Sequence, residues 1–167
     1  MKEVVVSDAF LQEMKAHARE SYPDECCGFL IGVAPETEGE RRRTISALER
    51  ARNEFDGERR RRFLILPEEL RDIERRMEQS GRAIVGFYHS HPDHPARPSE
   101  FDRDHAWPWY SYLVLGVTAR GEGPVGAFEL DPESGEFFPA PVVTERASDW
   151  SDGKRTPKSL SREKGIP

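Results

Sequence analysis

The chain has 167 residues, 34% of them charged, and a formal net charge of −6. That length fits one domain whose core is large enough to fold without a metal, and the acidic balance argues against a nucleic-acid partner. The apolar run after Lys2 is too short for a signal peptide, and no run is long enough to span a membrane. We therefore expect a cytoplasmic protein with no membrane partner.

Arginine and cysteine clusters each have a simple interpretation. The arginine runs at 41–43 and 59–62 could bind phosphate or an acidic surface, but we interpret them as solvated strand ends and loops. Cys26 and Cys27 are adjacent and lie outside any CxxC pair, so neither a disulfide between them nor a zinc site is expected. The apolar residues that follow predict a buried strand, and we expect both thiols to be reduced core residues.

The first half of the chain is expected to form two helices and three strands. Ser7 can cap a helix whose apolar positions are about one turn apart and which ends at Tyr22-Pro23. Pro67 starts the second helix and Gly81 stops it. The strands are predicted at 26–33, 42–53 and 62–66, with a polar loop at 35–40 and a hairpin tip at 56–57.

The second half adds an apolar strand from Ala83 to His89, a proline-rich loop, and a short helix that starts at Ser99. Strands interleaved with helices indicate an α/β fold, a single domain over 1–145 with a mixed sheet packed between helices. The polar segment 146–167 is predicted to be a flexible tail, with a docking segment as the alternative. The remaining strands are predicted at 112–118, 125–130 and 137–143.

A potential metal site lies between His89 and Asp102. Residues two apart on a strand face the same side, so His89 and His91 present both imidazoles to one point. After seven residues that include three prolines, Ser99 caps a helix whose first turn carries Asp102. Two imidazoles and one carboxylate are three ligands for a zinc ion that keeps its fourth position open for water, which is typical of a hydrolytic site.

Each half of this pattern also has a purely structural interpretation. A Ser-x-x-Asp pair is a common helix cap, and an HxH pair often occurs by chance. The two halves together, joined by the proline loop, favour the metal site. A fourth protein ligand would close the water position, so we place His94 and His105 around the site or on the surface. His17 in the first helix is expected to be an exposed or a core histidine.

The spacing His-x-His, seven residues, Ser-x-x-Asp resembles the signature of the JAMM (MPN-plus) zinc metallopeptidases. The likeness extends upstream over residues 23–32 and downstream over residues 107–114. The resemblance implies a cytidine-deaminase-like (JAB/MPN) α/β fold with a mixed sheet packed between helices. A deaminase itself is disfavoured, because the His-x-Glu and Pro-Cys-x-x-Cys pieces of that chemistry are absent.

The resemblance also implies a set of site residues. Glu25 would be the catalytic general base, and the Ser99 hydroxyl would help to stabilise the oxyanion of the tetrahedral intermediate. One Zn²⁺ per chain would be held by His89, His91 and Asp102. The residues alone do not single out Glu25, because a carboxylate before a buried strand is only compatible with that role.

The residues of the motif resemble those of the short bacterial and archaeal branch of the family, whose members process ubiquitin-like sulfur-carrier proteins. It implies a zinc peptidase or isopeptidase that cuts the amide bond after the C-terminal Gly-Gly of such a partner. Only eight residues separate Asp102 from Ser111, too few for the segment with which eukaryotic relatives grip a second ubiquitin. Trp107 or Trp109 could wall the groove for the tail, or could simply pack.

Two rival functions remain. One is a non-catalytic MPN-type scaffold that binds ubiquitin-like partners; such members typically lose metal ligands, and none is missing here. The other is a JAMM-like protein attached to DNA metabolism, which the acidic net charge and the lack of an appended nucleic-acid-binding domain disfavour.

Overall fold

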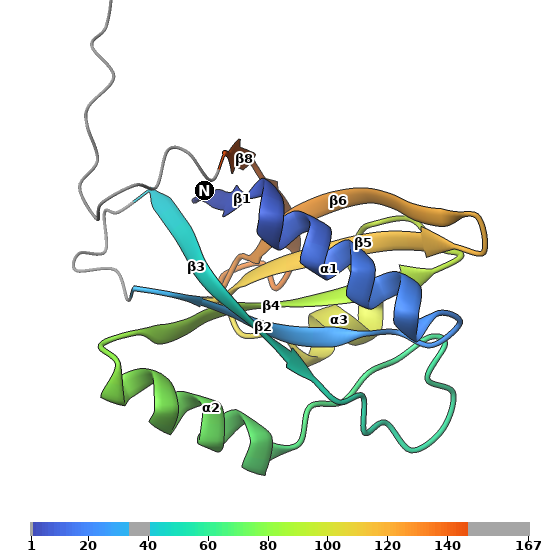
Figure 1. The fold of residues 1–167 in the computed structure, drawn as a ribbon, viewed down its shortest axis with the longest axis horizontal. Helices are drawn as coiled ribbons and strands as arrows, with labels where there is room; N and C mark the ends of the chain where they lie inside the picture. Colours follow the sequence, from blue (N-terminus) through green and yellow to red (C-terminus); the bar gives the residue numbers. More distant parts are fainter. Residues whose placement is uncertain (1, 34–40, 147–167) are drawn as a thin grey trace, which may run out of the picture.

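The computed structural model describes residues 2–33 and 41–146, which form one mixed eight-stranded sheet and three helices (Figure 1). The loop predicted at 35–40 and nearly all of the predicted tail lie outside these residues. None of the described helices is long and apolar enough to cross a membrane. The elements are β1 (Glu3–Ser7), α1 (Asp8–Ser21), β2 (Cys27–Gly32), β3 (Arg42–Ala51), α2 (Pro67–Gln79), β4 (Ala83–Pro92), α3 (Glu100–His105), β5 (Ser111–Thr118), β6 (Gly121–Leu130), β7 (Phe137–Ala140) and β8 (Val142–Glu145).

The sheet has the order β7-β6-β5-β4-β2-β3-β1-β8 and mixed strand directions. Strand β4, near its centre, is antiparallel to β2 and parallel to β5. At one end, β1 runs parallel to both β3 and β8. This arrangement confirms the expected α/β fold with a mixed sheet between helices.

Helices α1 and α2 cover opposite faces of the sheet (Figure 1). Helix α1 buries Met14 and Ala18, one turn apart, in the core on one face. Helix α2 buries Ile73 and Met77, also one turn apart, in the core on the other face. The proline at the first position of α2 fits there because its missing N–H has no partner to lose. We call the two faces the α1 face and the α2 face.

Strand β4 places the candidate ligands on the α2 face. A bulge at Val85 interrupts the side-chain alternation. After it, Tyr88 joins the core on the α1 face, whereas Phe87 packs with the core on the α2 face. His89 and His91 follow Phe87 at two-residue spacing and therefore share its face. The strand extends to residue 92, beyond its predicted end, so the second histidine also lies within the sheet.

The strand predicted at 62–66 is wrong, because a side chain replaces the strand partner. The amide of Asn53 donates to Arg62 O at 3.0 Å, and its Oδ1 accepts the Leu64 N–H at 3.2 Å. The segment is thus held beside residue 53 without a strand ladder, and residues 52–66 contain no strand. The hairpin tip predicted at 56–57 is present only as a bend.

The strand predicted at 137–143 is also wrong in extent, because it divides at Pro141 into β7 and β8. Strand β7 pairs with β6 at one edge of the sheet, and β8 pairs with β1 at the other edge. The carbonyl of Pro141 accepts the Val4 N–H at 2.9 Å. Because one residue joins the two edges, the sheet must curl until they meet at this point. The sequence had not predicted β1.

Arg43 contradicts the interpretation of the first arginine run as solvated. It is buried, and its guanidinium donates to Val85 O and to Ser111 Oγ, both at 3.0 Å. The other two arginines of that run are exposed, and so are all four at 59–62. A long side chain from a strand end can reach the interior when carbonyl and hydroxyl acceptors await it there.

Candidate metal centre and active site

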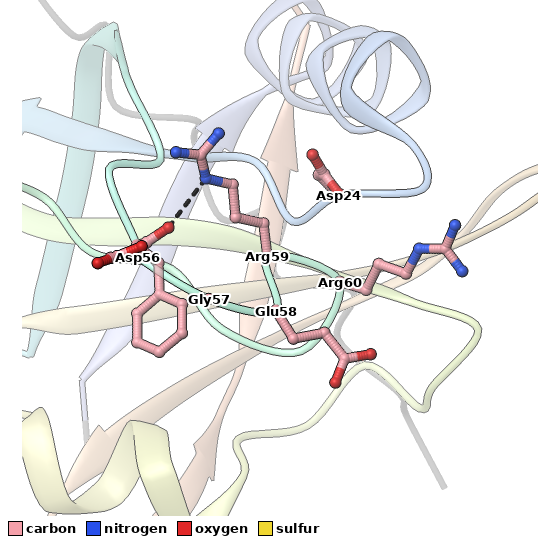
Figure 2. A pocket seen from close by; sticks show the side chains of 7 residues that line it. Asp24, Asp56, Gly57, Glu58, Arg59 and Arg60 are labelled. Atoms are coloured by element: carbon pink, nitrogen blue, oxygen red, sulfur yellow. Dashed lines mark hydrogen bonds between the residues drawn. The ribbon is translucent and has the colours of Figure 1, made fainter.

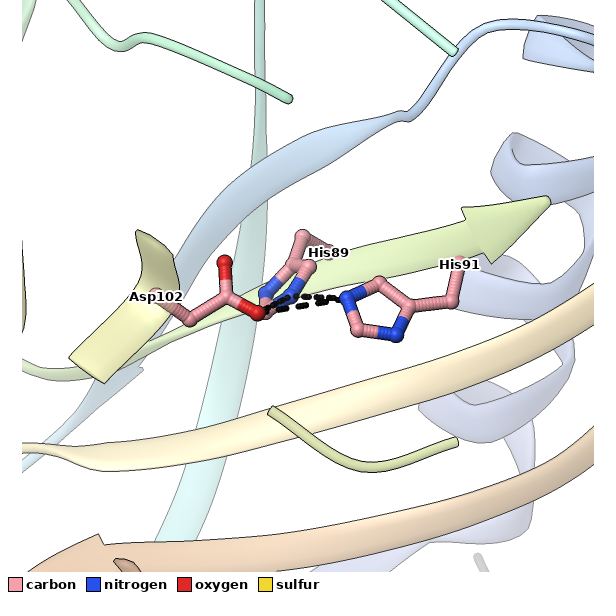
Figure 3. A group of neighbouring side chains, drawn as sticks. All are labelled: His89, His91 and Asp102. Atoms are coloured by element: carbon pink, nitrogen blue, oxygen red, sulfur yellow. Dashed lines mark hydrogen bonds and ion pairs between the residues drawn. The ribbon is translucent and has the colours of Figure 1, made fainter. Parts of the chain in front are cut away.

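His89, His91 and Asp102 converge on one point (Figure 3). The two Nε2 atoms are 3.1 Å apart, and Asp102 Oδ2 lies 3.2 Å from each of them. Strand β4 supplies both rings and α3 supplies the carboxylate. The three side chains are 2%, 8% and 8% exposed. Across residues 2–33 and 41–146, no other group of His, Cys, Asp and Glu side chains could hold a metal in this way. We call the three side chains the ligand cluster.

The hydrogen bonds around the rings favour a cation inside the ligand cluster. His91 Nδ1 lies 3.0 Å from Pro95 O, which can only accept, so this nitrogen carries the proton. In the neutral ring, His91 Nε2 then presents a lone pair to Asp102 Oδ2, which is also an acceptor. Two acceptors in contact repel each other unless a positive charge lies between them. His89 Nδ1 is buried without a partner in the described chain, and its ring stacks on Phe63 at 4.7 Å.

The donor set fits zinc in number, type and spacing. Tetrahedral zinc with bonds of about 2.0–2.1 Å keeps its donors about 3.3 Å apart, close to the 3.1 and 3.2 Å found here. The neighbouring carboxylate oxygen, Glu25 Oε1, is 3.9 Å from His91 Nε2. Three protein donors would leave a fourth position of the ion open.

The start of α3 fixes Asp102. Its Oδ2 accepts the Ser99 N–H at 2.7 Å, and Ser99 Oγ accepts the Asp102 N–H at 3.1 Å, which together form a capping box. The cap and the candidate ligand are therefore compatible. Burial alone would raise the pKa of Asp102, but His89, His91 and the Ser99 N–H hold it well below its usual range. Because the cap uses only a lone pair of Ser99 Oγ, the hydroxyl proton remains able to donate.

Glu25 lies just before β2, beside the ligand cluster. Its side chain is 4% exposed, and its Oε2 has no hydrogen-bond partner in the described chain. Burial, and then the negative charge of Asp102, raises the pKa of Glu25 to about 9. Without a cation, this carboxyl group would be protonated at neutral pH. A cation in the ligand cluster would favour the ionised form, so Glu25 fits the role of a base only in the loaded site.

The loop at 52–66 holds the backbone of Glu25. The Glu25 N–H donates to Arg59 O at 2.8 Å, and the Glu25 carbonyl accepts from Asn53 Nδ2 at 3.1 Å. Arg59 Nε in turn donates to Phe55 O at 2.9 Å (Figure 2). The loop lines an open, polar cavity of about 410 Å³ here, and Figure 2 shows side chains that line it. Sequence reasoning missed Asn53, whose role depends on contacts with both ends of the loop.

Two cavities adjoin the ligand cluster, and Phe101 lines both. The apolar cavity, of about 430 Å³, has His89 and Asp102 in its wall. The arginine-lined cavity, of about 500 Å³, has His91 and Glu25 in its wall. The apolar cavity is further lined mainly by Phe55, Phe63, Leu64, Phe87, Trp107 and Tyr112. The arginine-lined cavity is further lined mainly by Arg61, Arg62, His94, Arg97, Ser99 and Glu100.

The other histidines lie outside the ligand cluster. His94 and His105 are both exposed; His94 lines the arginine-lined cavity, and the His105 ring stacks on Phe101 at 4.1 Å. His17 is the core histidine of the two possibilities, since it is buried with Nδ1 2.9 Å from the Tyr88 hydroxyl.

The tryptophans and cysteines differ in exposure. Trp107 and Trp109 are each 60% exposed, and of the two only Trp107 lines the apolar cavity. Cys26 and Cys27 are free and buried, as expected, and burial raises the pKa of Cys26 to about 11. Neither thiol is therefore poised to react.

The mixed sheet, with a histidine pair at a strand end and a carboxylate on the following short helix, fits the resemblance to the JAMM proteins that the sequence indicates. The chain belongs to the family described as prokaryotic homologs of the JAB domain, whose profile matches residues 7–130. This confirms the resemblance to the prokaryotic branch of the JAMM proteins. A curated relative from Haloferax volcanii, named desampylase, is 35% identical over 114 residues, which cover 68% of this chain and 77% of that protein.

Two solution structures share the fold. A protein from Desulfitobacterium hafniense superposes with a TM-score of 0.72 at 26% identity, covering 86% of this chain and 93% of that one. A protein from Salinibacter ruber gives a TM-score of 0.63 at 33% identity, covering 87% and 92% of the respective chains. The described domain therefore has counterparts of similar length.

Proposed function

We propose that this protein is a zinc-dependent peptidase or isopeptidase that cuts the amide bond after the C-terminal Gly-Gly of a ubiquitin-like or sulfur-carrier protein. The observation that carries the proposal is the convergence of three donor atoms, 3.1 and 3.2 Å apart, beside the buried carboxyl group of Glu25. The relative named desampylase supports a hydrolase that acts on a ubiquitin-like protein. A scaffold that only binds such partners has no need of a buried, unpartnered carboxyl group.

The residues divide the reaction among them. A zinc ion held by His89, His91 and Asp102 would supply a Lewis acid and lower the pKa of water to about 7. Glu25 accepts a proton from the attacking water and delivers it to the leaving nitrogen as the C–N bond breaks. The Ser99 hydroxyl donates to the oxyanion that develops on the scissile carbonyl. One water is consumed, and the products are a carrier carboxylate and a free amine.

The extended segment 62–66 offers a place for the carrier tail. Phe63 and Ile65 pack against the core on the α2 face, and their backbone groups make no hydrogen bond within the described residues. A tail added beside this segment as a strand would use those free groups. Glycine next to the ligand cluster would let the tail backbone approach closely, since it has no side chain to fit between the walls.

The test compares three substrates: a Gly-Gly carrier extended by one cysteine, the same adduct with Gly-Gly changed to Ala-Ala, and lysine-linked di-ubiquitin. We expect efficient cleavage of the first, little of the second and little of the third, measured as kcat/KM by mass spectrometry. Efficient di-ubiquitin cleavage, or indifference to the alanines, would contradict the substrate assignment.

The Glu25→Gln variant is the matched control, because its side chain keeps the shape of Glu25 but cannot accept the proton. We expect it to retain zinc and the fold while losing about 10²- to 10⁴-fold in activity. Near-normal turnover by this variant would refute the proposed role of Glu25.

A further inference from the structure

The positions of the site residues indicate which of the two cavities holds the leaving group of the substrate. Glu25, His91 and Ser99 line the arginine-lined cavity, whereas the apolar cavity is lined by His89 and Asp102 without Glu25. The group that protonates the leaving nitrogen must lie within hydrogen-bond reach of it. If Glu25 is that group, as in the proposed function, the leaving group occupies the arginine-lined cavity.

That cavity gathers arginines whose charge is not neutralised nearby. Arg62 and Arg97 make no ion pair with a carboxylate in the described chain, and Arg61 reaches only Glu58, at 4.0 Å. Other arginines of the described chain, such as Arg52 and Arg71, also lack a carboxylate partner, but Arg61, Arg62 and Arg97 share the wall of one cavity. Elsewhere, each of the following arginines contacts a carboxylate at 3.4 Å or less: Arg19, Arg42, Arg50, Arg76 and Arg103.

Arg62 is also held in position. Its guanidinium carbon lies 4.6 Å from the centre of the Phe101 ring and 5.9 Å from that of Phe55. Stacking on aromatic rings restricts an arginine while leaving its N–H groups free to donate. Phe101 lines both cavities, so the Arg62 guanidinium stacks on a ring that the two cavities share. Besides Glu25, Glu100 is the acidic residue that lines this cavity.

We infer that Arg62 and Arg97, with Arg61, form a subsite for a carboxylate in the leaving group, close to the scissile nitrogen. This inference rests on the proposed function and deepens it. Arginine recognises a carboxylate through paired N–H donors, and two kinds of leaving group carry a carboxylate within a few bonds of the scissile nitrogen. The first is the α-carboxylate of a single amino acid attached through its α-amino group; the second is an acidic side chain at the first position of a longer leaving peptide. A lysine isopeptide offers neither, because four methylene groups separate its nitrogen from the lysine backbone.

The test uses one Gly-Gly carrier with three C-terminal extensions: alanine as the free acid, alanine as the carboxamide, and aspartate as the carboxamide. We expect kcat/KM for the free acid to exceed that for the alanine carboxamide by about 10-fold, the value of a hydrogen bond to a charged group. Cleavage of the aspartate carboxamide separates the two sources: a rate near that of the free acid means that a side-chain carboxylate also binds, and a low rate limits the subsite to the α-carboxylate.

The variant Arg62→Gln/Arg97→Gln should lower the ratio of kcat/KM for the free acid to kcat/KM for the alanine carboxamide from about 10-fold to about one. Arg60→Gln is the control for charge on the loop: it removes one positive charge from the loop that carries Arg62, at a residue that does not line this cavity. Calorimetric binding of the free acid and the carboxamide adducts to the Glu25→Gln variant gives a readout independent of turnover. Equal kcat/KM and equal binding for the two would overturn the subsite, whereas failure to cleave any adduct would overturn the proposed function instead.

Discussion

The polar groups on the two faces of strand β4 differ in whether the chain itself supplies their hydrogen-bond partners. On the α1 face, the Tyr88 hydroxyl is paired with His17 at 2.9 Å, and Ser90 Oγ accepts the Cys26 N–H at 2.8 Å. On the α2 face, the next residues along the same strand, His89 and His91, belong to a cluster in which acceptors face each other. The first face is complete within the chain, and the second is arranged for something bound from outside.

Alanine in place of a ligand should have the largest effect. His91→Ala removes one of three donors, so we expect the loss of bound zinc and of activity in a protein that still folds, because the hydrophobic clusters on the two faces remain intact. Ser90→Ala, on the other face of β4, is the control. It should keep zinc and lose about 1–3 kcal/mol of stability, because it leaves the buried Cys26 N–H without its acceptor. Metal analysis and denaturant unfolding measure the two effects. Undiminished zinc in the triple variant of His89, His91 and Asp102 would refute the site.

Substitution of Ser99 should have the second-largest effect, because its hydroxyl accepts a hydrogen bond in the helix cap and would donate one to the proposed oxyanion. Ser99→Ala should lower kcat by about 10²- to 10³-fold and stability by about 1 kcal/mol. Ser99→Gly also lacks the hydroxyl but costs a helix cap only a few tenths of a kcal/mol. Equal losses of kcat in the two variants would assign the effect to the lost donor, and a near-normal kcat in the glycine variant would assign it to the cap.

The metal-free protein should lose stability as the pH rises. The folded-state pKa of Glu25 is about 9 against an ordinary value of 4.5, so between these values the folded state holds a proton that the unfolded state has released. The stabilisation is complete below pH 4.5 and disappears as the pH passes 9. Its steepest slope is about 1.4 kcal/mol per pH unit.

Denaturant unfolding of the chelated protein at pH 7 and pH 9 measures this slope. Burial lowers the pKa of His17 from 6.5 to about 4, so its effect on stability falls mainly between these two values, below the window from pH 7 to pH 9. The Glu25→Gln variant should show a flatter profile. The same slope in both proteins would mean that another group is responsible.

Tyr88→Phe should have the smallest effect on zinc binding and activity, because the side chain lies on the opposite face of β4 from the ligand cluster. The substitution keeps the ring but leaves His17 Nδ1 buried without its partner, at a cost of about 1–3 kcal/mol. We expect a lower Tm with normal zinc content and a normal kcat, checked by calorimetry, metal analysis and kinetics. Loss of zinc would show that the two faces of β4 are coupled.

The local parts of this architecture could be predicted from the sequence. The facing of His89 and His91 follows from strand periodicity, and the Ser99–Asp102 pair follows from helix capping. Both depend on residues close in the chain. Glu25 came from the family resemblance, because a carboxylate before a buried strand is too common a pattern to single out.

The remaining features depend on partners far away in the sequence. The Asn53 side chain, and not a neighbouring strand, bonds the backbone of residues 62–66. The alternation of apolar and polar residues there therefore predicted a strand that the structure does not contain. Arg43 is buried because Val85 O and Ser111 Oγ accept its hydrogen bonds from two other strands. The bulge in β4 and the cavities beside the ligand cluster likewise arise only when several elements pack together.

Because β8 follows Pro141 near the end of the described chain, the sheet can close only late in synthesis. Val4 and Val5 of β1 pair with Val142 and Val143 of β8, more than 130 positions later in the chain. While the ribosome is still translating the residues between them, β1 has a buried, apolar strand edge and no outer neighbour to cover it. The first strand to emerge therefore obtains its outer partner last, which makes closure of the sheet a slow, long-range step that a nascent chain completes only after residue 145 has left the ribosome.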